Sequence, residues 1–133
     1  MMVGIQGFTK VVLETNSELP LVTAAEELAQ ATGAEIAYRS QIGVPAEGEI
    51  ILLVAGAALA FPQVNSRLGD VPRGSEWGLV QQINGALIIA GSTPRNVCHA
   101  ALRWITEPSR ETDRLSVSGV SDRLTMWDNS MNQ

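Results

Sequence analysis

The dipeptide Asn84-Gly85, set between two apolar runs, constrains the fold of this chain more than any other feature of its sequence. Trp77–Ile83 precedes the dipeptide and Ala86–Ala90 follows it. Asparagine followed by glycine tolerates the positive φ angles of a tight type I′ turn, which joins antiparallel strands. The pattern therefore predicts a β-hairpin whose second strand breaks at Gly91.

A helix is expected directly after the hairpin. Ser92 or Thr93 can cap it, and Pro94 suits its first position because the missing amide hydrogen of proline is not needed there. The helix should end before Pro108, since the residue before a proline disfavours helical geometry. The apolar positions that recur at helical spacing are Val97, Ala101, Trp104 and Ile105.

The first part of the chain predicts a strand, a helix and a second strand. A β-branched run within Gly7–Thr15 is short enough for a strand. Ser17 and Pro20 open the helix, and Gly33 supplies the left-handed residue that closes it. Ala34–Arg39 alternates as a short strand does. The apolar stripe of the helix consists of Leu21, Ala24, Ala25, Leu28 and Ala31.

The segment Glu49–Ala55 predicts a central strand buried on both faces, because it is almost continuously apolar. Gly56–Ser75 has the composition of a surface loop, with room for one helical turn at Phe61–Leu68. The chain is polar from Ser109 onward, apart from a strand-like piece at Arg114–Val120.

This order of elements predicts an α+β fold: a single mixed β-sheet with two helices packed mainly on one face, and an extended C-terminal tail. We expect an accessory domain over residues 1–108. Residues 109–133 are expected to form a linker and the beginning of a catalytic barrel that lies outside this sequence.

Composition narrows the classes of function. The net charge of −5 comes from interspersed acidic and basic residues, so no basic stripe indicates nucleic-acid binding. The single cysteine, Cys98, allows neither an internal disulfide nor a thiolate metal cage, which favours a reducing, cytoplasmic location. Met1–Lys10 lacks the features of a secretion signal, and Ile50–Phe61 is too short to span a bilayer. We expect no cofactor and no membrane partner.

Two arrangements could carry chemistry, and each has a structural interpretation that we favour. Cys98 and His99 are adjacent on a helix and point about 100° apart, so they are unsuited to share a proton as nucleophile and base. The turn Gly91–Arg95 could present amides to an anion, but its spacing matches no nucleotide-binding fingerprint. Capping of the helix explains Ser92 and Thr93, while Arg95 is free to pair with a carboxylate of another domain or of a sugar acid.

The three tryptophans differ in their expected roles. Trp104 lies on the apolar stripe of the last helix and is predicted to be core. Trp77 is expected to pack in the hairpin. Trp127 belongs to Met126-Trp127-Asp128-Asn129, where an aromatic ring, a carboxylate and an amide follow one another, as in many sugar-binding sites. The alternative for this segment is a disordered terminus.

Three blocks in order resemble the N-terminal region of bacterial xylan-degrading α-glucuronidases. They are Ala24–Leu28 with Ala31–Gly33, the hairpin-to-helix block Gly85–Arg95, and the tail Met126–Asn129. The fold is similar to the small domain that precedes the barrel of β-N-acetylhexosaminidases. The family tends to have glycine and tyrosine where this sequence has Asn96 and His99.

The resemblance implies a non-catalytic N-terminal domain, or a fragment, of a glycoside hydrolase acting on the glucuronic acid side chains of xylan. Its partner would be the barrel of the same enzyme, which supplies the two carboxyl groups that hydrolysis requires. No catalytic or metal-binding residue is assigned here. An acidic oligosaccharide would be bound by Arg95, Trp127, Asp128 and Asn129.

Two other classes of function stay open. One is a free-standing interaction module without enzymatic activity that forms homo-oligomers or docks on a partner through its hairpin edge. The other, which we rank last, is a small hydrolase using Cys98 or His99. Such a hydrolase would lose its activity on thiol alkylation.

Overall fold

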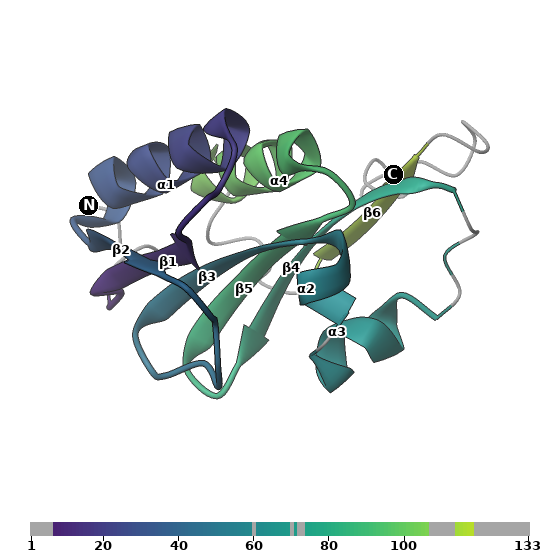
Figure 1. The fold of residues 1–133 in the computed structure, drawn as a ribbon, viewed down its shortest axis with the longest axis horizontal. Coiled ribbons are helices and arrows are strands. Elements are labelled where there is room, and N and C mark those ends of the chain that lie inside the picture. Colours follow the sequence, from purple (N-terminus) through teal and green to yellow (C-terminus); the bar gives the residue numbers. More distant parts are fainter. Residues whose placement is uncertain (1–6, 60, 70, 72–73, 107–113, 119–133) are drawn as a thin grey trace.

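A computed structural model describes residues 7–59, 61–69, 71, 74–106 and 114–118 of the chain. Within these residues six strands form one sheet, and four helices cover its two faces (Figure 1). The elements are β1 Lys10–Glu14, α1 Leu19–Thr32, β2 Glu35–Arg39, β3 Glu49–Val54, α2 Ala55–Leu59, α3 Pro62–Arg67, β4 Glu76–Ile83, β5 Ala86–Gly91, α4 Pro94–Thr106 and β6 Arg114–Ser118.

The sheet is mixed, with strand order β2-β1-β3-β5-β4-β6. Strands β2, β1, β3 and β5 run parallel to one another, whereas β4 runs antiparallel to both β5 and β6. The prediction of an α+β fold with a single mixed sheet is therefore confirmed. In this strand order β1 and β3 are neighbours. The chain continues from β1 toward one edge of the sheet and from β3 toward the other.

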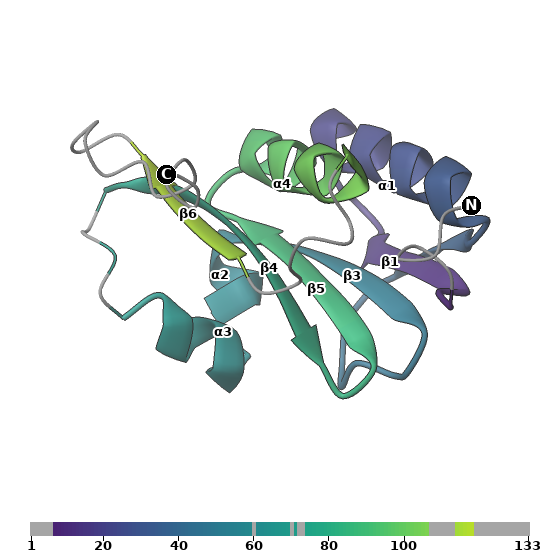
Figure 2. The ribbon, with the colours of Figure 1, turned by 180° about the vertical axis from the view of Figure 1, so that it is seen from behind.

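The long helices α1 and α4 lie next to each other on one face of the sheet, as Figures 1 and 2 show from opposite sides. Strand β3 contributes to the apolar clusters on both faces of the sheet, because its successive side chains point to opposite faces. Ile50 and Leu52 join the cluster under α1 and α4, while Ile51 and Leu53 join a second cluster under α2 and α3. Two helices on one face are thus confirmed, and the short helices occupy the other face.

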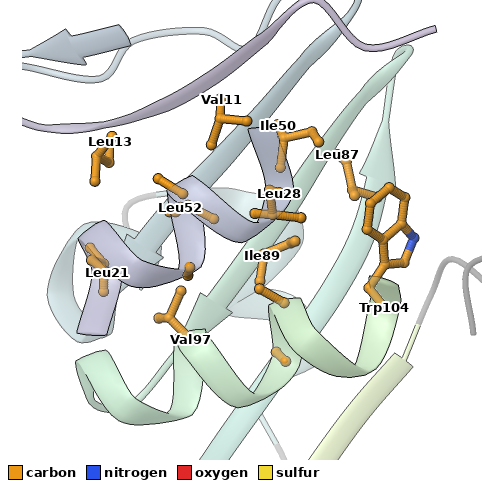
Figure 3. Packing of buried hydrophobic residues seen from close by; sticks show 14 of the residues in the cluster. Val11, Leu13, Leu21, Leu28, Ile50, Leu52, Leu87, Ile89, Val97 and Trp104 are labelled. Carbon is orange, nitrogen blue, oxygen red and sulfur yellow. The ribbon is translucent and has the colours of Figure 1, made fainter. Parts of the chain in front are cut away.

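The larger cluster is an apolar layer between the sheet and the two long helices (Figure 3). Leu28 of α1, Ile89 of β5 and Val97 of α4 are all fully buried there. At the end of the layer Trp104 packs edge-on against Phe8, with 5.8 Å between ring centroids. Trp104 is therefore a core residue, as its position on the apolar stripe predicts.

The predicted turn and the Gly33 cap are confirmed, whereas Ser17 does not cap the first helix, because Glu18 is the N-cap residue and makes no side-chain cap bond. Asn84 and Gly85 have φ angles of 50° and 85°, the signs that a type I′ turn requires. Gly33 closes α1 with φ 81°, and its amide donates to the carbonyl of Ala29. Helix α1 begins at Leu19, so Pro20 occupies the second helical position.

One boundary prediction is wrong. The central strand ends at Val54, and Ala55 begins the short helix α2 rather than ending the strand. Ala55 has φ 44°, and this left-handed residue turns the chain out of the sheet. The apolar sequence after Val54 reads as a continuation of the strand, so sequence alone gives no signal for the break. The helical turn expected at Phe61–Leu68 is present as α3.

The hairpin strand β4 is covered by a further strand over its first part, Glu76–Val80. Strand β6 pairs with β4 from Glu76 opposite Ser118 to Val80 opposite Arg114. The interaction module with an exposed hairpin edge is therefore not supported at these positions. The pairing also shows that the sheet extends beyond residue 108, into the segment expected to be a linker.

Candidate functional site

A polar crevice lies at the carboxyl ends of the parallel strands. Its volume is about 310 Å³. It lies between β1 and β3, where the chain continues from β1 to β2 on one side and from β3 to β4 on the other. Such a topological switch point is where open α/β sheets bind their ligands. The residues that line it are Glu14, Thr15, Asn16, Ser17, Glu18, Leu21, Ser40, Val54 and Pro94.

Backbone hydrogen bonds fix the wall of the crevice that connects β1 to α1. The amide of Thr15 donates to the carbonyl of Arg39 at 3.0 Å, which ties the end of β1 to the end of β2. The amide and Oγ of Ser17 both donate to the carbonyl of Glu14, at 3.2 and 2.6 Å. The carbonyl of Glu18 accepts from Leu21 to begin α1. These bonds fix the backbone of the connection from β1 to α1.

The far wall of the crevice includes the first turn of α4, whose capping is satisfied internally. The Asn96 amide donates to Thr93 Oγ1 at 3.2 Å, which confirms Thr93 as a cap. The Asn96 side chain donates to Ser92 Oγ and Thr93 Oγ1 at 2.9 and 3.0 Å. Thr93 therefore caps α4, whereas the Ser92 hydroxyl accepts from the backbone amide of Trp77 at 3.0 Å and ties the turn to β4.

Of the four residues expected to bind substrate, the structure describes one. Arg95 is exposed on the first turn of α4 and is not among the residues that line the crevice. Trp127, Asp128 and Asn129 lie outside the described residues. The role of the four in sugar binding therefore stays a prediction.

Cys98 and His99 have the environments expected of structural residues. Cys98 is partly buried and packs at the edge of the main core, whereas His99 is exposed. Burial, and secondly the nearby carboxylate of Glu27, raises the pKa of the Cys98 thiol. A thiol with a raised pKa is a poor nucleophile at neutral pH, because the thiolate is the reactive form.

We expect iodoacetamide to alkylate Cys98 in the folded chain more slowly at pH 7.5 than in the urea-unfolded chain. The raised pKa leaves less thiolate in the folded state. The folded state disfavours the thiolate and so favours the protonated thiol. This thiol therefore contributes to the stability of the fold at pH values below its unfolded pKa, about 8.5, and the contribution is lost as the pH rises through the higher pKa of the folded state. Rates followed by mass spectrometry test this expectation. Faster alkylation of the folded chain would contradict it and revive the nucleophile hypothesis.

A second, apolar cavity lies on the α2–α3 side, between the β2–β3 connection, the start of α3 and the hairpin turn. We call it the apolar groove, and its volume is about 370 Å³. Val44 is 89% exposed beside it, the largest exposure among the described large apolar residues. The residues that line the groove are Ile42, Gly43, Val44, Pro45, Phe61, Pro62, Gln63, Ile83 and Asn84.

The β2–β3 connection that forms one wall of the groove is anchored by a buried carboxylate. Glu49 is 7% exposed, and its Oε2 accepts from the Arg39 guanidinium at 2.9 Å. Its Oε1 accepts from the amide of Ala46 at 3.1 Å. The amide of Gly48 donates to the carbonyl of Gly85, which ties the same connection to the hairpin turn. Val44 is thus exposed to solvent on a loop whose backbone is held by these bonds.

No family model matches the chain, and no curated protein matches it significantly. Across the described part of the chain, no three histidine, cysteine, aspartate or glutamate side chains come together as a metal site would require. None of the described helices combines the length and the apolarity that crossing a bilayer demands.

Sequence reasoning missed both cavities. Among the residues that line the crevice, the sequence pattern marks Ser17, Leu21 and Pro94, and it places each of them in or at the start of a helix. The available signal was the polar run Glu14–Glu18 directly after a buried strand, which is where ligand-binding residues lie in parallel sheets. The groove had a weaker signal, the exposed apolar Val44 beside Gly43 and Pro45 in a connection between strands.

Proposed function

We propose that this chain is a non-catalytic accessory domain of an α-glucuronidase-like glycoside hydrolase that acts on the glucuronic acid side chains of xylan. Its role would be to pack against the catalytic barrel of the same polypeptide. The resemblance of three sequence blocks supports this proposal, as does the α+β fold that the resemblance implies. A cytoplasmic location belongs to the proposal and is favoured by the single cysteine.

The observation that carries the proposal is the apolar groove. Exposed apolar surface that gathers into one hollow marks an interaction site more often than scattered apolar residues do. Val44 protrudes from its wall, and the groove continues to Phe61 and Ile83. An adjoining domain that places apolar side chains there would bury this surface. At about 25 cal/mol per Å² of apolar area, even a modest contact would hold two tethered domains together.

The substitution Val44→Asp is expected to undock the domain without unfolding it. Val44 is 89% exposed, so the change should alter the stability of the chain alone by about 0.5 kcal/mol or less. A buried, unpaired carboxylate at a domain interface is strongly unfavourable. In the product of the complete reading frame, we expect calorimetry to show one cooperative transition for the wild type and two for Val44→Asp.

The matched control is Leu19→Asp, the same change at an apolar residue that is 74% exposed and lies outside the groove. It should leave the single transition intact, since an acidic residue at the start of α1 is favoured by the helix dipole. Identical transitions for both variants and the wild type would contradict docking through the groove.

The free-standing module remains the alternative, and the same groove could then receive a second copy of the chain. Light scattering of this chain separates the two proposals. A stable dimer that Val44→Asp dissociates would favour the module. The accessory domain is expected to be a monomer.

Arg95 is exposed and so accessible to an acidic oligosaccharide, and Arg95→Ala is expected to weaken the binding of such a ligand.

A further inference from the structure

Strand β2 forms one edge of the sheet, and no described strand pairs with its outer side. The amide of Glu35 donates to the carbonyl of Thr9, and the carbonyl of Arg39 also accepts from the β1 side of the strand. Successive residues of a strand alternate in the direction of their backbone groups. The amides and carbonyls of Ile36 and Tyr38 therefore point outward, where a further strand can be added.

The sequence of β2, Glu-Ile-Ala-Tyr-Arg, is complementary to itself when two copies run antiparallel. A two-fold axis between two identical edges produces this antiparallel arrangement. With Ala37 opposite its own copy, Glu35 of each chain lies opposite Arg39 of the other. An edge strand with like charges at both ends would repel its copy, as edge strands often do. The opposite charges at the two ends of β2 attract instead.

The inner positions of the same register also fit. Ile36 lies opposite Tyr38 of the second copy, and these are the residues whose backbone groups point outward. Such a pair exchanges two hydrogen bonds between the strands. Ile36 packs against the main core cluster, and Tyr38 is 48% exposed. A β-branched side chain opposite an aromatic ring is a favourable cross-strand pair, which would cover part of this exposed ring.

The two charged side chains are available for this contact. Glu35 is exposed, and among the described residues no ion pair holds its carboxylate. The Arg39 guanidinium donates from Nη2 to Oε2 of Glu49 at 2.9 Å, and its side chain is still 37% exposed. A guanidinium carries five N–H donors, so the bond to Glu49 leaves donors for a second carboxylate.

We propose that two copies of this chain associate through the outer edges of β2, as an antiparallel pair that joins the two sheets into one. The contact is short, because β2 has only five residues, so we expect a Kd on the order of 0.1 mM. The chain is then largely monomeric in dilute solution. This contact is separate from the apolar groove and does not depend on the proposed function.

Sedimentation equilibrium of this chain, from about 10 µM to about 1 mM, tests the contact. We expect reversible dimers of the wild type, and roughly tenfold weaker association of Glu35→Arg, because like charges then face each other. The matched control is Glu76→Arg, at an exposed glutamate that also begins a strand but lies on the far side of the sheet. It changes the net charge equally and should associate as the wild type does.

Tyr38→Pro is a second variant, which removes an outward N–H and keeps the hydrogen bonds to β1. Proline is tolerated in an edge strand where its nitrogen faces solvent. Circular dichroism checks that the variant is folded, and we expect it to stay monomeric.

Four outcomes would overturn the proposal. One is a wild type that stays monomeric at about 1 mM. Equal affinities of Glu35→Arg and Glu76→Arg would show that net charge alone governs the association. Unchanged association of folded Tyr38→Pro would exclude pairing at this edge. Dissociation of the dimer by Val44→Asp would place the contact in the apolar groove instead.

Discussion

Gly91→Ala should destabilise the chain by about 3 kcal/mol, because a β-carbon at this position has no room. An ideal Cβ on Gly91 would lie 2.6 Å from the backbone nitrogen of Val97 and 2.8 Å from the backbone carbon of Asn96. These atoms belong to the first turn of α4 and cannot move aside as a flexible side chain can. The helix would have to lift from the end of β5. Urea unfolding followed by circular dichroism measures the effect.

Gly78→Ala is the matched control for this prediction. Gly78 pairs with Gly91 across the hairpin and is also buried. A Cβ there would meet Ala100 and Asn96 at 3.5 Å, an ordinary van der Waals distance. We expect a change of about 1 kcal/mol or less. If Gly91→Ala were as stable as Gly78→Ala, the close approach of α4 to β5 would be refuted.

Trp104→Ala should be the second large effect, with a loss of about 3 to 5 kcal/mol. The side chain is 2% exposed and contacts Phe8 edge-on at the end of the main core. Its removal leaves a cavity between α4 and the sheet, next to Leu87 (Figure 3). Since a domain of this size is stabilised by only about 5 to 15 kcal/mol, the variant should be close to unfolding at 37 °C.

Leu102→Ala, two residues earlier on α4, separates the loss of core packing from any general effect on the helix. Leu102 is 40% exposed, and its truncation should cost less than about 1 kcal/mol. Similar unfolding midpoints for the two variants would contradict the assignment of Trp104 to the core. Trp104→Phe should fall between them, because it keeps an aromatic ring against Phe8.

The parts of the fold that depend on neighbouring residues could be predicted from the sequence. The turn at Asn84-Gly85 and the left-handed cap at Gly33 follow from the φ angles that these residues allow. The cap at Thr93 and the start of α4 at Pro94 follow from the hydrogen bonds of a helix N-terminus. In each case the residue type itself determines the local geometry.

The parts that depend on strand order could not be predicted. The crevice exists because β1 and β3 are neighbours, which brings Glu14, Ser40 and Val54 together from three strand ends. Apolar patterns say which segments are strands but not how they are arranged. The pairing of β6 with β4 is equally non-local. The left-handed Ala55 had no signal, because alanine rarely adopts this conformation.

The lining of the crevice was not predicted from the sequence for a related reason. Arg95 was chosen for its charge and its place in a resembling turn, and the structure finds it exposed but outside both cavities. The residues that line the crevice are common polar types, Thr15, Asn16 and Ser17 among them. Their shared position becomes visible only when the ends of the parallel strands are assembled.

The proposed function makes this chain a non-catalytic domain of a larger glycoside hydrolase. The most direct measurement is the release of glucuronic acid from aldouronic acid oligosaccharides, by this chain alone and by the product of the complete reading frame. The account predicts no release by the chain alone and steady release by the complete product. Release by the chain alone, or none by the complete product, would contradict it.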